Sequence, residues 1–169
     1  AFSAAAVKAG YQAKYLVRTG MSILSNRHAE GAEITGNDIF DRYAGRVMFP
    51  IHDDGGRVVA FGGRTLSSDK KTAKYINSPE TEIYNKSRIL YGLWLGKRSI
   101  QDKNSVYLVE GYMDVIAMHR AGLRYSVAPL GTALTADQLG LLWRTAPEPL
   151  LCFDGDDAGI KAAHRAMDL

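Results

Sequence analysis

The sequence predicts an α/β protein, with a mixed α/β region over residues 1–103 and a parallel sheet flanked by helices over residues 104–169. In the second region, apolar segments of strand length alternate three times with amphipathic segments of helix length, and short links join them. This alternation is typical of a parallel α/β sheet. With 169 residues, of which 46% are hydrophobic, the chain is long enough to bury a core in one or two small domains.

The first region shows less regular patterns. Residues 1–30 begin with a helical pattern of weak periodicity. The segments 46–53 and 57–66 are joined by "DGG" and predict a β-hairpin, because glycine allows the tight turn between two apolar runs. The polar stretch 67–87 is too long for an ordinary connection and favours a functional loop. Apolar residues at helical spacing predict a helix over 88–100.

The second region has clearer element boundaries. Gly122 is expected to close the first helix. Thr135, followed three residues later by Gln138, forms a capping box that opens the second helix. Strands are expected at 106–110, 125–130 and 150–153, and helices at 112–122, 135–146 and 158–169.

Composition narrows the class of protein. A single cysteine, Cys152, excludes an internal disulfide framework and a zinc site built on paired cysteines, and its apolar surroundings predict a buried thiol. No stretch is long and apolar enough for a membrane span, so we expect a soluble protein of a reducing compartment. Residues 1–103 hold 16 Lys/Arg against 10 Asp/Glu, and residues 104–169 hold 5 against 8. This suits a polyanion bound beside a cation site, although ordinary surface scatter remains an alternative.

Acidic residues follow two of the predicted strands. Glu110 and Gly111 end the first strand, and "DGD" at 154–156 ends the third. In parallel α/β sheets ligands bind at the carboxyl ends of the strands. If the two strands are neighbours, Glu110, Asp154 and Asp156 converge, and such a set of oxygen ligands favours Mg²⁺.

Other interpretations of "DGDDAG" are weaker. Asp157 is expected to cap the helix that begins near Ala158, which leaves Asp156 for the metal. The helix dipole also explains an acid at Asp114. An EF-hand would need glutamate where Arg165 stands. An aspartyl-phosphate motif would continue with threonine, whereas this chain has alanine.

Several segments together resemble a known family. "VEGYMDVIAMHRAG", "LGTAL" and "DGDDAGIKAA" resemble the Toprim domain of bacterial primases, topoisomerases and some nucleases, and more narrowly the bacterial DnaG-type DNA primase. "DRYAGRVMFPIHDDGGRVVAFGGRTL", "AKYINSPETEIYNKS" and "LYGL" resemble the polymerase core of the same family. The resemblance spans roughly residues 40–169. It implies a mixed α/β subdomain followed by a Toprim domain, Rossmann-like and truncated at its C-terminus.

The resemblance also implies roles for individual residues. Glu110, Asp154 and Asp156 match catalytic acids, of which Glu110 supports metal organisation and acid/base work on the attacking 3′-hydroxyl. The divalent metal, Mg²⁺ or Mn²⁺, would be bound by these three acids together with Asp114. The implied nucleotide- and DNA-binding residues are Arg64, Lys74, Asn77, Ser78 and Lys86. Tyr75, Tyr84 and Tyr91 are possible base-stacking residues, and we expect at least two of them to pack in the core.

The function implied is that of a fragment of a DNA-dependent RNA polymerase, a primase, that makes short RNA primers on single-stranded DNA. Its partners would be the template, nucleoside triphosphates, the RNA primer and, through a C-terminal domain outside this chain, the replicative helicase. The location would be the bacterial cytoplasm at the replication fork, with no membrane contact. Zinc is expected only in an N-terminal domain outside this chain. The family's third acidic motif is also missing, so the fragment alone is expected to be weakly active or inactive.

Two other classes of function stay open. One is a nuclease or topoisomerase with the same domain, although no tyrosine here has a context that supports strand cleavage. The other is a non-catalytic DNA-binding scaffold, which the intact acidic residues disfavour.

Overall fold

The computed structural model describes residues 1–69, 71–131 and 133–169, and the chain folds as two units. The first unit comprises Ala1–Pro50 with Ala60–Ile83, and the second comprises Ile51–Val59 with Tyr84–Leu169. Lys70 of the predicted loop and Thr132 of "LGTAL" lie outside the described residues. Within the described ranges, no helix combines the length and the apolar character needed to cross a membrane.

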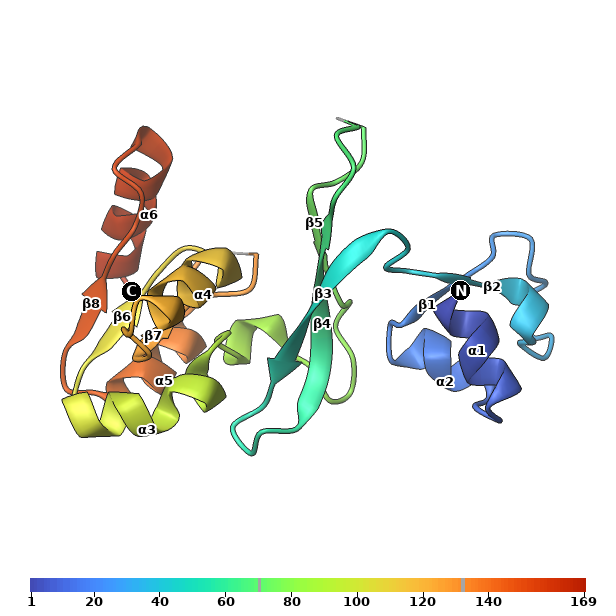
Figure 1. The fold of residues 1–169 in the computed structure, drawn as a ribbon, viewed down its shortest axis with the longest axis horizontal. Coiled ribbons are helices and arrows are strands. Elements are labelled where there is room, and N and C mark those ends of the chain that lie inside the picture. The colour runs from blue at the N-terminus through green and yellow to red at the C-terminus, as the bar shows by residue number, and fades with distance from the viewer. Residues whose placement is uncertain (70, 132) are drawn as a thin grey trace. The chain divides into compact units, whose positions relative to one another are not determined.

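The first unit begins with two short helices that pack on a small two-stranded sheet (Figure 1). Its apolar cluster joins Ala6, Ala13, Leu16 and Ile39. The elements are α1 (Phe2–Lys8), α2 (Ala13–Arg18), β1 (Ser22–Leu24), the 3₁₀ turn η1 (Gly36–Asp38) and β2 (Ile39–Asp41). The weak periodicity of residues 1–30 therefore corresponds to two short helices and one strand, and not to a continuous helix.

A second sheet, ordered β3-β4-β5, carries the predicted hairpin. Its strands are β3 (Arg46–His52), β4 (Val58–Thr65) and β5 (Tyr75–Asn77). The Asp53 carboxylate accepts the N–H groups of Gly55 and Arg57, which fixes the turn between β3 and β4. The hairpin is confirmed. The prediction of one long loop over 67–87 was partly wrong, because β5 pairs antiparallel with β4 inside it.

The second unit contains a three-stranded parallel sheet with helices packed around it (Figure 1). Its buried apolar cluster includes Leu90, Ile100, Val106, Leu108 and Leu142. The sheet order is β7-β6-β8. The elements are the 3₁₀ turn η2 (Lys86–Arg88), α3 (Leu93–Lys103), β6 (Val106–Leu108), α4 (Tyr112–Arg120), β7 (Ser126–Val127), α5 (Ala136–Thr145), β8 (Pro149–Leu151) and α6 (Asp157–Met167).

The predicted α/β architecture is confirmed, with two local corrections. The helix expected from residue 88 begins at Leu93, because Tyr91 is extended and pairs with Ala128, and Gly92 adopts a left-handed conformation with φ +85°. Gly92 also has no room for a side chain, since a Cβ would lie 2.8 Å from Val115 Cγ1. Cys152, expected to be buried, is exposed, just after the edge strand β8.

Candidate metal centre and nucleic-acid interface

The acidic site lies at the carboxyl ends of β6 and β8, which are neighbours in the sheet. Glu110 follows β6 by two residues, and Asp154 follows β8 by three. The Glu110 Oε1 accepts the backbone N–H of Asp154 at 2.9 Å, so the glutamate joins the two strand ends directly. The predicted convergence of the acids required the first and third strands of this unit to be adjacent, and β6 and β8 are adjacent.

Asp156, and not Asp157 as the sequence predicted, caps the N-terminus of α6. It is the N-cap of α6, and its Oδ1 accepts the N–H groups of Ala158 at 3.0 Å and of Gly159 at 2.9 Å. Asp157, expected to be the cap, is instead the first residue of the helix. The extended conformation of Asp156, with φ −88° and ψ 172°, lets its side chain turn back onto the first helical turn.

Asp114 likewise serves the backbone. Its Oδ2 accepts the Gly111 N–H at 2.9 Å at the start of α4, so the alternative that this acid supports its own helix terminus agrees with the geometry. Glu110, Asp114, Asp154 and Asp156 are all exposed. Within the ranges that the structure describes, no three Asp, Glu, His or Cys side chains are close enough together to hold a metal ion.

Two surface cavities meet at Glu110. One, of ≈ 390 Å³, is lined by Glu110, Asp114 and Asp154 together with α4. The other, of ≈ 320 Å³, is lined by Glu110, by Pro129, Ala133 and Leu134, and by α6. The glutamate is therefore reached by solvent from both sides, which is what a ligand-binding carboxylate requires.

Gly159 is a site residue that sequence reasoning missed. A Cβ at this position would lie 2.1 Å from the Asp154 carbonyl oxygen and 2.8 Å from Glu110 Oε1. Only glycine allows the first turn of α6 to approach the two acids this closely. The second glycine of "DGDDAG" could have drawn attention to this position, but the sequence alone does not show that it packs against Asp154 and Glu110.

The polar residues predicted to bind nucleotide or DNA in the first unit lie on or beside β4 and β5: Arg64 is on β4, Asn77 is on β5, and Lys74 and Ser78 flank β5. Arg64 and Tyr75 are register partners in the two strands. The Arg64 guanidinium lies 5.6 Å from the centre of the Tyr75 ring, and Lys74 Nζ lies 5.8 Å from it. Tyr75 is exposed, whereas Tyr84 and Tyr91 are buried, so the expectation that at least two of these tyrosines pack in the core is confirmed.

Asn77 and Ser78 differ in what they offer a ligand. The Asn77 Oδ1 is buried and has no hydrogen-bond partner among the described residues, which leaves an unsatisfied acceptor. Ser78 is 1% exposed, and its hydroxyl contacts the Tyr43 hydroxyl at 2.8 Å and accepts the Phe61 N–H. In this arrangement the Ser78 side chain stabilises β4 and β5 from inside and does not present an open donor to a ligand.

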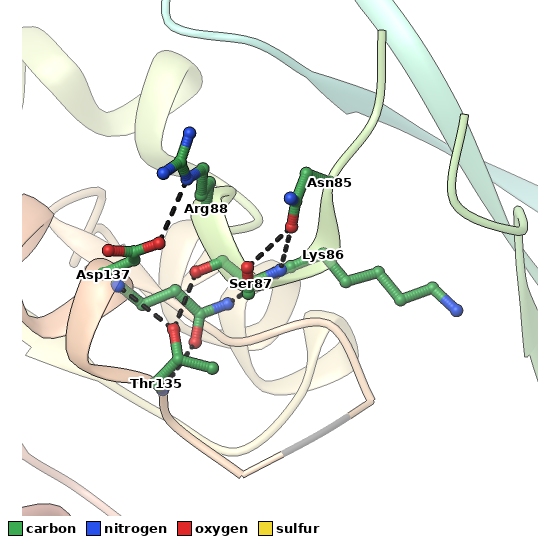
Figure 2. Close-up of polar contacts among 7 residues, drawn as sticks. Asn85, Lys86, Ser87, Arg88, Thr135 and Asp137 are labelled. Carbon is green, nitrogen blue, oxygen red and sulfur yellow. Dashed lines mark hydrogen bonds and ion pairs between the residues drawn. The ribbon is translucent and has the colours of Figure 1, made fainter. Parts of the chain in front are cut away.

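Lys86 belongs to the second unit and lies on η2, next to the N-terminus of α5 (Figure 2). Its side chain extends away from the polar contacts that hold this turn. The structure thus brings Glu110, Asp154 and Asp156 to neighbouring strand ends, groups Arg64 with Lys74, and places Lys86 on a separate turn.

A parallel sheet with "EG" and "DGD" at adjacent strand ends defines the Toprim class, and residues 104–169 match the family described as the Toprim domain. Residues 1–97 match the DNA primase catalytic core, N-terminal domain. The chain belongs to the DNA primase catalytic core family.

Known proteins agree with this assignment. A DNA primase of Pseudomonas putida is 51% identical over 129 residues, which are 76% of this chain and 19% of that protein. A DNA primase domain from Pseudomonas aeruginosa superposes with a TM-score of 0.80 at 44% identity, covering 92% of this chain and 45% of the other. A DnaG primase catalytic domain solved bound to single-stranded DNA gives a TM-score of 0.79 at 43% identity, with 92% and 45% covered. The chain therefore spans only part of the proteins it matches.

Proposed function

We propose that this chain is part of the polymerase core of a bacterial primase, which synthesises short RNA primers on single-stranded DNA by metal-dependent nucleotidyl transfer. The observation that carries the proposal is the hydrogen bond from the Asp154 backbone to Glu110, which joins two acidic strand ends at the edge where parallel sheets bind ligands. Membership of the primase core family supports it. We also propose that the chain comprises a basic part of the primase core over residues 1–103 and a Toprim domain over residues 104–169, in line with the two family matches.

The acidic site suits Mg²⁺ or Mn²⁺. The donors proposed are Glu110, Asp154 and Asp156, with Asp114 at the edge of the same cavity. They are exposed carboxylates, and oxygen ligands of this kind are the ones that hard divalent cations prefer. Glu110 and Asp156 each commit one oxygen to a backbone N–H, so the other oxygen of each remains for the ion. Gly159 allows the first turn of α6 to pack directly against Asp154 and Glu110.

The residues of the chain would divide the chemistry of primer synthesis as follows. A bound divalent metal would neutralise charge on the reacting phosphate groups. Asp154 and Asp156 would hold it, and Glu110 would organise it and accept the proton of the attacking 3′-hydroxyl. Phosphoryl transfer depends mainly on such positioning and charge neutralisation.

The polar residues would bind the polyanions. We propose that Arg64, Lys74 and Lys86 contact phosphates of the template or of incoming nucleotides. We propose that Asn77 contacts the same ligands through its side-chain NH₂ group, since its Oδ1 is buried. Because its hydroxyl is buried, Ser78 would not contact the ligand and would instead hold β5 in place. The relative captured with single-stranded DNA supports a DNA template as partner.

The wider setting follows from the family. We propose nucleoside triphosphates and the RNA primer as further ligands, the replicative helicase as a partner bound through another part of the whole protein, and the bacterial cytoplasm at the replication fork as the location. The isolated 169 residues are proposed to be weakly active or inactive, because in the ranges that the structure describes no three acidic, histidine or cysteine side chains are gathered closely enough to hold a metal ion.

Metal binding tests the proposed site directly. Titration calorimetry with Mn²⁺ is expected to show binding to the unmodified chain and an affinity lower by about tenfold or more in Asp154→Asn, since fewer ligand charges weaken a hard-cation site. Asp168→Asn, an exposed acid just beyond the other end of α6, is the matched control and should bind like the unmodified chain. Lack of binding in every protein would favour a non-catalytic scaffold.

A further inference from the structure

The turn that carries Lys86 is held by side chains from the start of α5, about fifty residues further along the chain (Figure 2). The Thr135 hydroxyl donates to the Ser87 carbonyl oxygen at 2.7 Å. The Gln138 Nε2 donates to two carbonyl oxygens of the same turn, that of Lys86 at 2.8 Å and that of Ile89 at 3.0 Å. Three backbone acceptors in four consecutive residues are thus bound by one helix terminus.

Gln138 makes more hydrogen bonds than a capping box needs. In that motif the two side chains bind each other's backbone N–H groups, and here Gln138 Oε1 accepts from Thr135 at 3.1 Å while Thr135 Oγ1 accepts from Gln138 at 3.2 Å. The two amide hydrogens of Gln138 then remain for Lys86 and Ile89. The side chain is fully buried, with 0% exposure, and its polar atoms are satisfied.

A second capping box in the chain shows that these extra bonds are not part of the motif. Thr35 and Asp38 form the same reciprocal pair at η1. The Thr35 hydroxyl there donates to Asp38 itself, whereas the Thr135 hydroxyl donates to Ser87. The α5 terminus is therefore both a cap for its own helix and a clamp on the Lys86 turn.

The loop that leads into the clamp borders the acidic site. The loop that precedes Thr135 contributes Pro129, Ala133 and Leu134 to the cavity that Glu110 also lines. On the outer side of the turn, Asn85 Oδ1 accepts from Ser87, and Arg88 pairs with Asp137 at 3.0 Å, but these groups are exposed and contribute little. The buried Gln138 makes two of the three hydrogen bonds by which α5 fixes the backbone of the turn.

We propose that Gln138 is a positioning residue for Lys86: its buried amide fixes the backbone from which that lysine projects toward phosphate. The inference rests on the proposed function, because it takes Lys86 to bind the phosphates of DNA. A lysine side chain has four rotatable bonds, and fixing them on binding costs entropy. An anchored backbone lowers the total entropy cost, because the backbone is already ordered when the ammonium group binds. Without the clamp the lysine would still be present, but its contact with phosphate would be lost or weakened.

The test measures binding of fluorescein-labelled oligodeoxythymidine to the full 169-residue chain by anisotropy over a series of NaCl concentrations. Lys86→Ala is expected to weaken binding about two- to fivefold and to lower the slope of log K against log salt by about 0.7, the loss of one phosphate contact on a single strand. Gln138→Met, which keeps the side-chain length but removes both donors, should reproduce both changes in part. Gln138→Glu keeps the acceptor for Thr135 but loses the donors, and should do the same.

Two comparisons separate positioning from mere stability. Thr145→Val removes a hydroxyl bond at the other end of α5 and should leave affinity and salt slope unchanged. In a Lys86→Ala background, Gln138→Met should have no further effect on DNA binding. If Gln138→Met lowers the melting temperature yet keeps the salt slope and affinity of the unmodified chain, the positioning role is wrong. If Lys86→Ala itself changes neither quantity, or the unmodified chain does not bind, the proposed phosphate contact fails and the positioning role fails with it.

Discussion

Single residues in the acidic site stabilise the backbone, and in our proposal the same residues also bind a cation. Glu110 binds the backbone of Asp154 with one carboxylate oxygen, and Asp156 caps α6 with one of its own. Each of these contacts fixes a strand end or a helix start, and each leaves a second oxygen for a cation. Because the carboxylates are anchored to the backbone, their mutual repulsion is offset in part by charge-assisted hydrogen bonds even before any ion is bound.

Gly159 is predicted to be essential to this packing. Gly159→Ala would place a Cβ against the Asp154 carbonyl and Glu110, so we expect it to destabilise the fold by about 1–3 kcal/mol and to weaken Mn²⁺ binding. The matched control is Gly140→Ala in α5, where nothing lies within 4 Å of the added Cβ and alanine should stabilise the helix by up to about 1 kcal/mol. Urea unfolding and calorimetry measure both effects. Equal behaviour of the two variants would contradict the prediction.

At the scale of elements, buried polar side chains hold the strands and turns that carry the basic residues. In the first unit, Arg46 Nη1 lies 3.4 Å from the carbonyl oxygens of Gly63 and Lys74. The Tyr43 ring packs on Gly63, where a Cβ would lie 2.7 Å from it. Its hydroxyl donates to the Phe61 carbonyl oxygen at 3.0 Å and contacts Ser78. Tyr43 in the turn before β3 and Arg46 at the start of β3 therefore hold β4 to the segment around β5.

Tyr43 provides a test of this arrangement. Burial raises the pKa of the Tyr43 hydroxyl above its ordinary value, so the group stays protonated and remains a donor throughout the neutral range. Tyr43→Phe should lower the free energy of unfolding by about 1–2 kcal/mol, because the Ser78 hydroxyl loses a buried partner. The control Tyr15→Phe removes an exposed hydroxyl and should change stability by less than about 0.5 kcal/mol. Denaturant titration compares the two; a Tyr43→Phe variant as stable as the control would refute the role of the hydroxyl.

For the whole molecule, the uneven distribution of charge agrees with the two kinds of proposed ligand. The basic residues on β4, just before β5 and on η2 belong to the part of the chain with an excess of Lys and Arg. The acidic strand ends belong to the part with an excess of Asp and Glu. Nucleotidyl transfer needs both, because phosphates must be held by cations while the metal is held by carboxylates.

The activity of the chain by itself is the prediction at this scale. We expect templated dinucleotide synthesis by the purified 169 residues, with Mg²⁺ or Mn²⁺, to be at or near background. The complete DNA primase of Pseudomonas putida serves as the active reference. Dinucleotide formation at a rate comparable to that of the reference would show that these residues alone assemble a working site, contrary to the proposal.

Much of the site was predictable because its signals are local. The alternation of apolar runs and amphipathic segments predicted the second unit, and the Thr135–Gln138 spacing predicted the start of α5. Acids directly after two strands predicted that Glu110 and Asp154 would meet at one edge of the sheet, as they do. The prediction of Asp157 as the cap was wrong, because Asp156 and Asp157 are adjacent residues of the same type and only the backbone conformation selects Asp156. It also missed β5, whose three residues form a strand only through pairing with β4.

By itself, the sequence determined the fold class, the acidic strand ends and the family, since these depend on periodicity, residue type and short motifs. Only the tertiary structure decided that β6 lies between β7 and β8, that Glu110 holds the Asp154 backbone, that Gly159 faces both acids and that Gln138 clamps the Lys86 turn. The physical reason is distance along the chain. Local patterns report on hydrogen bonds and burial within one element, whereas these contacts join residues separated by about forty to fifty positions, or depend on how closely two elements pack.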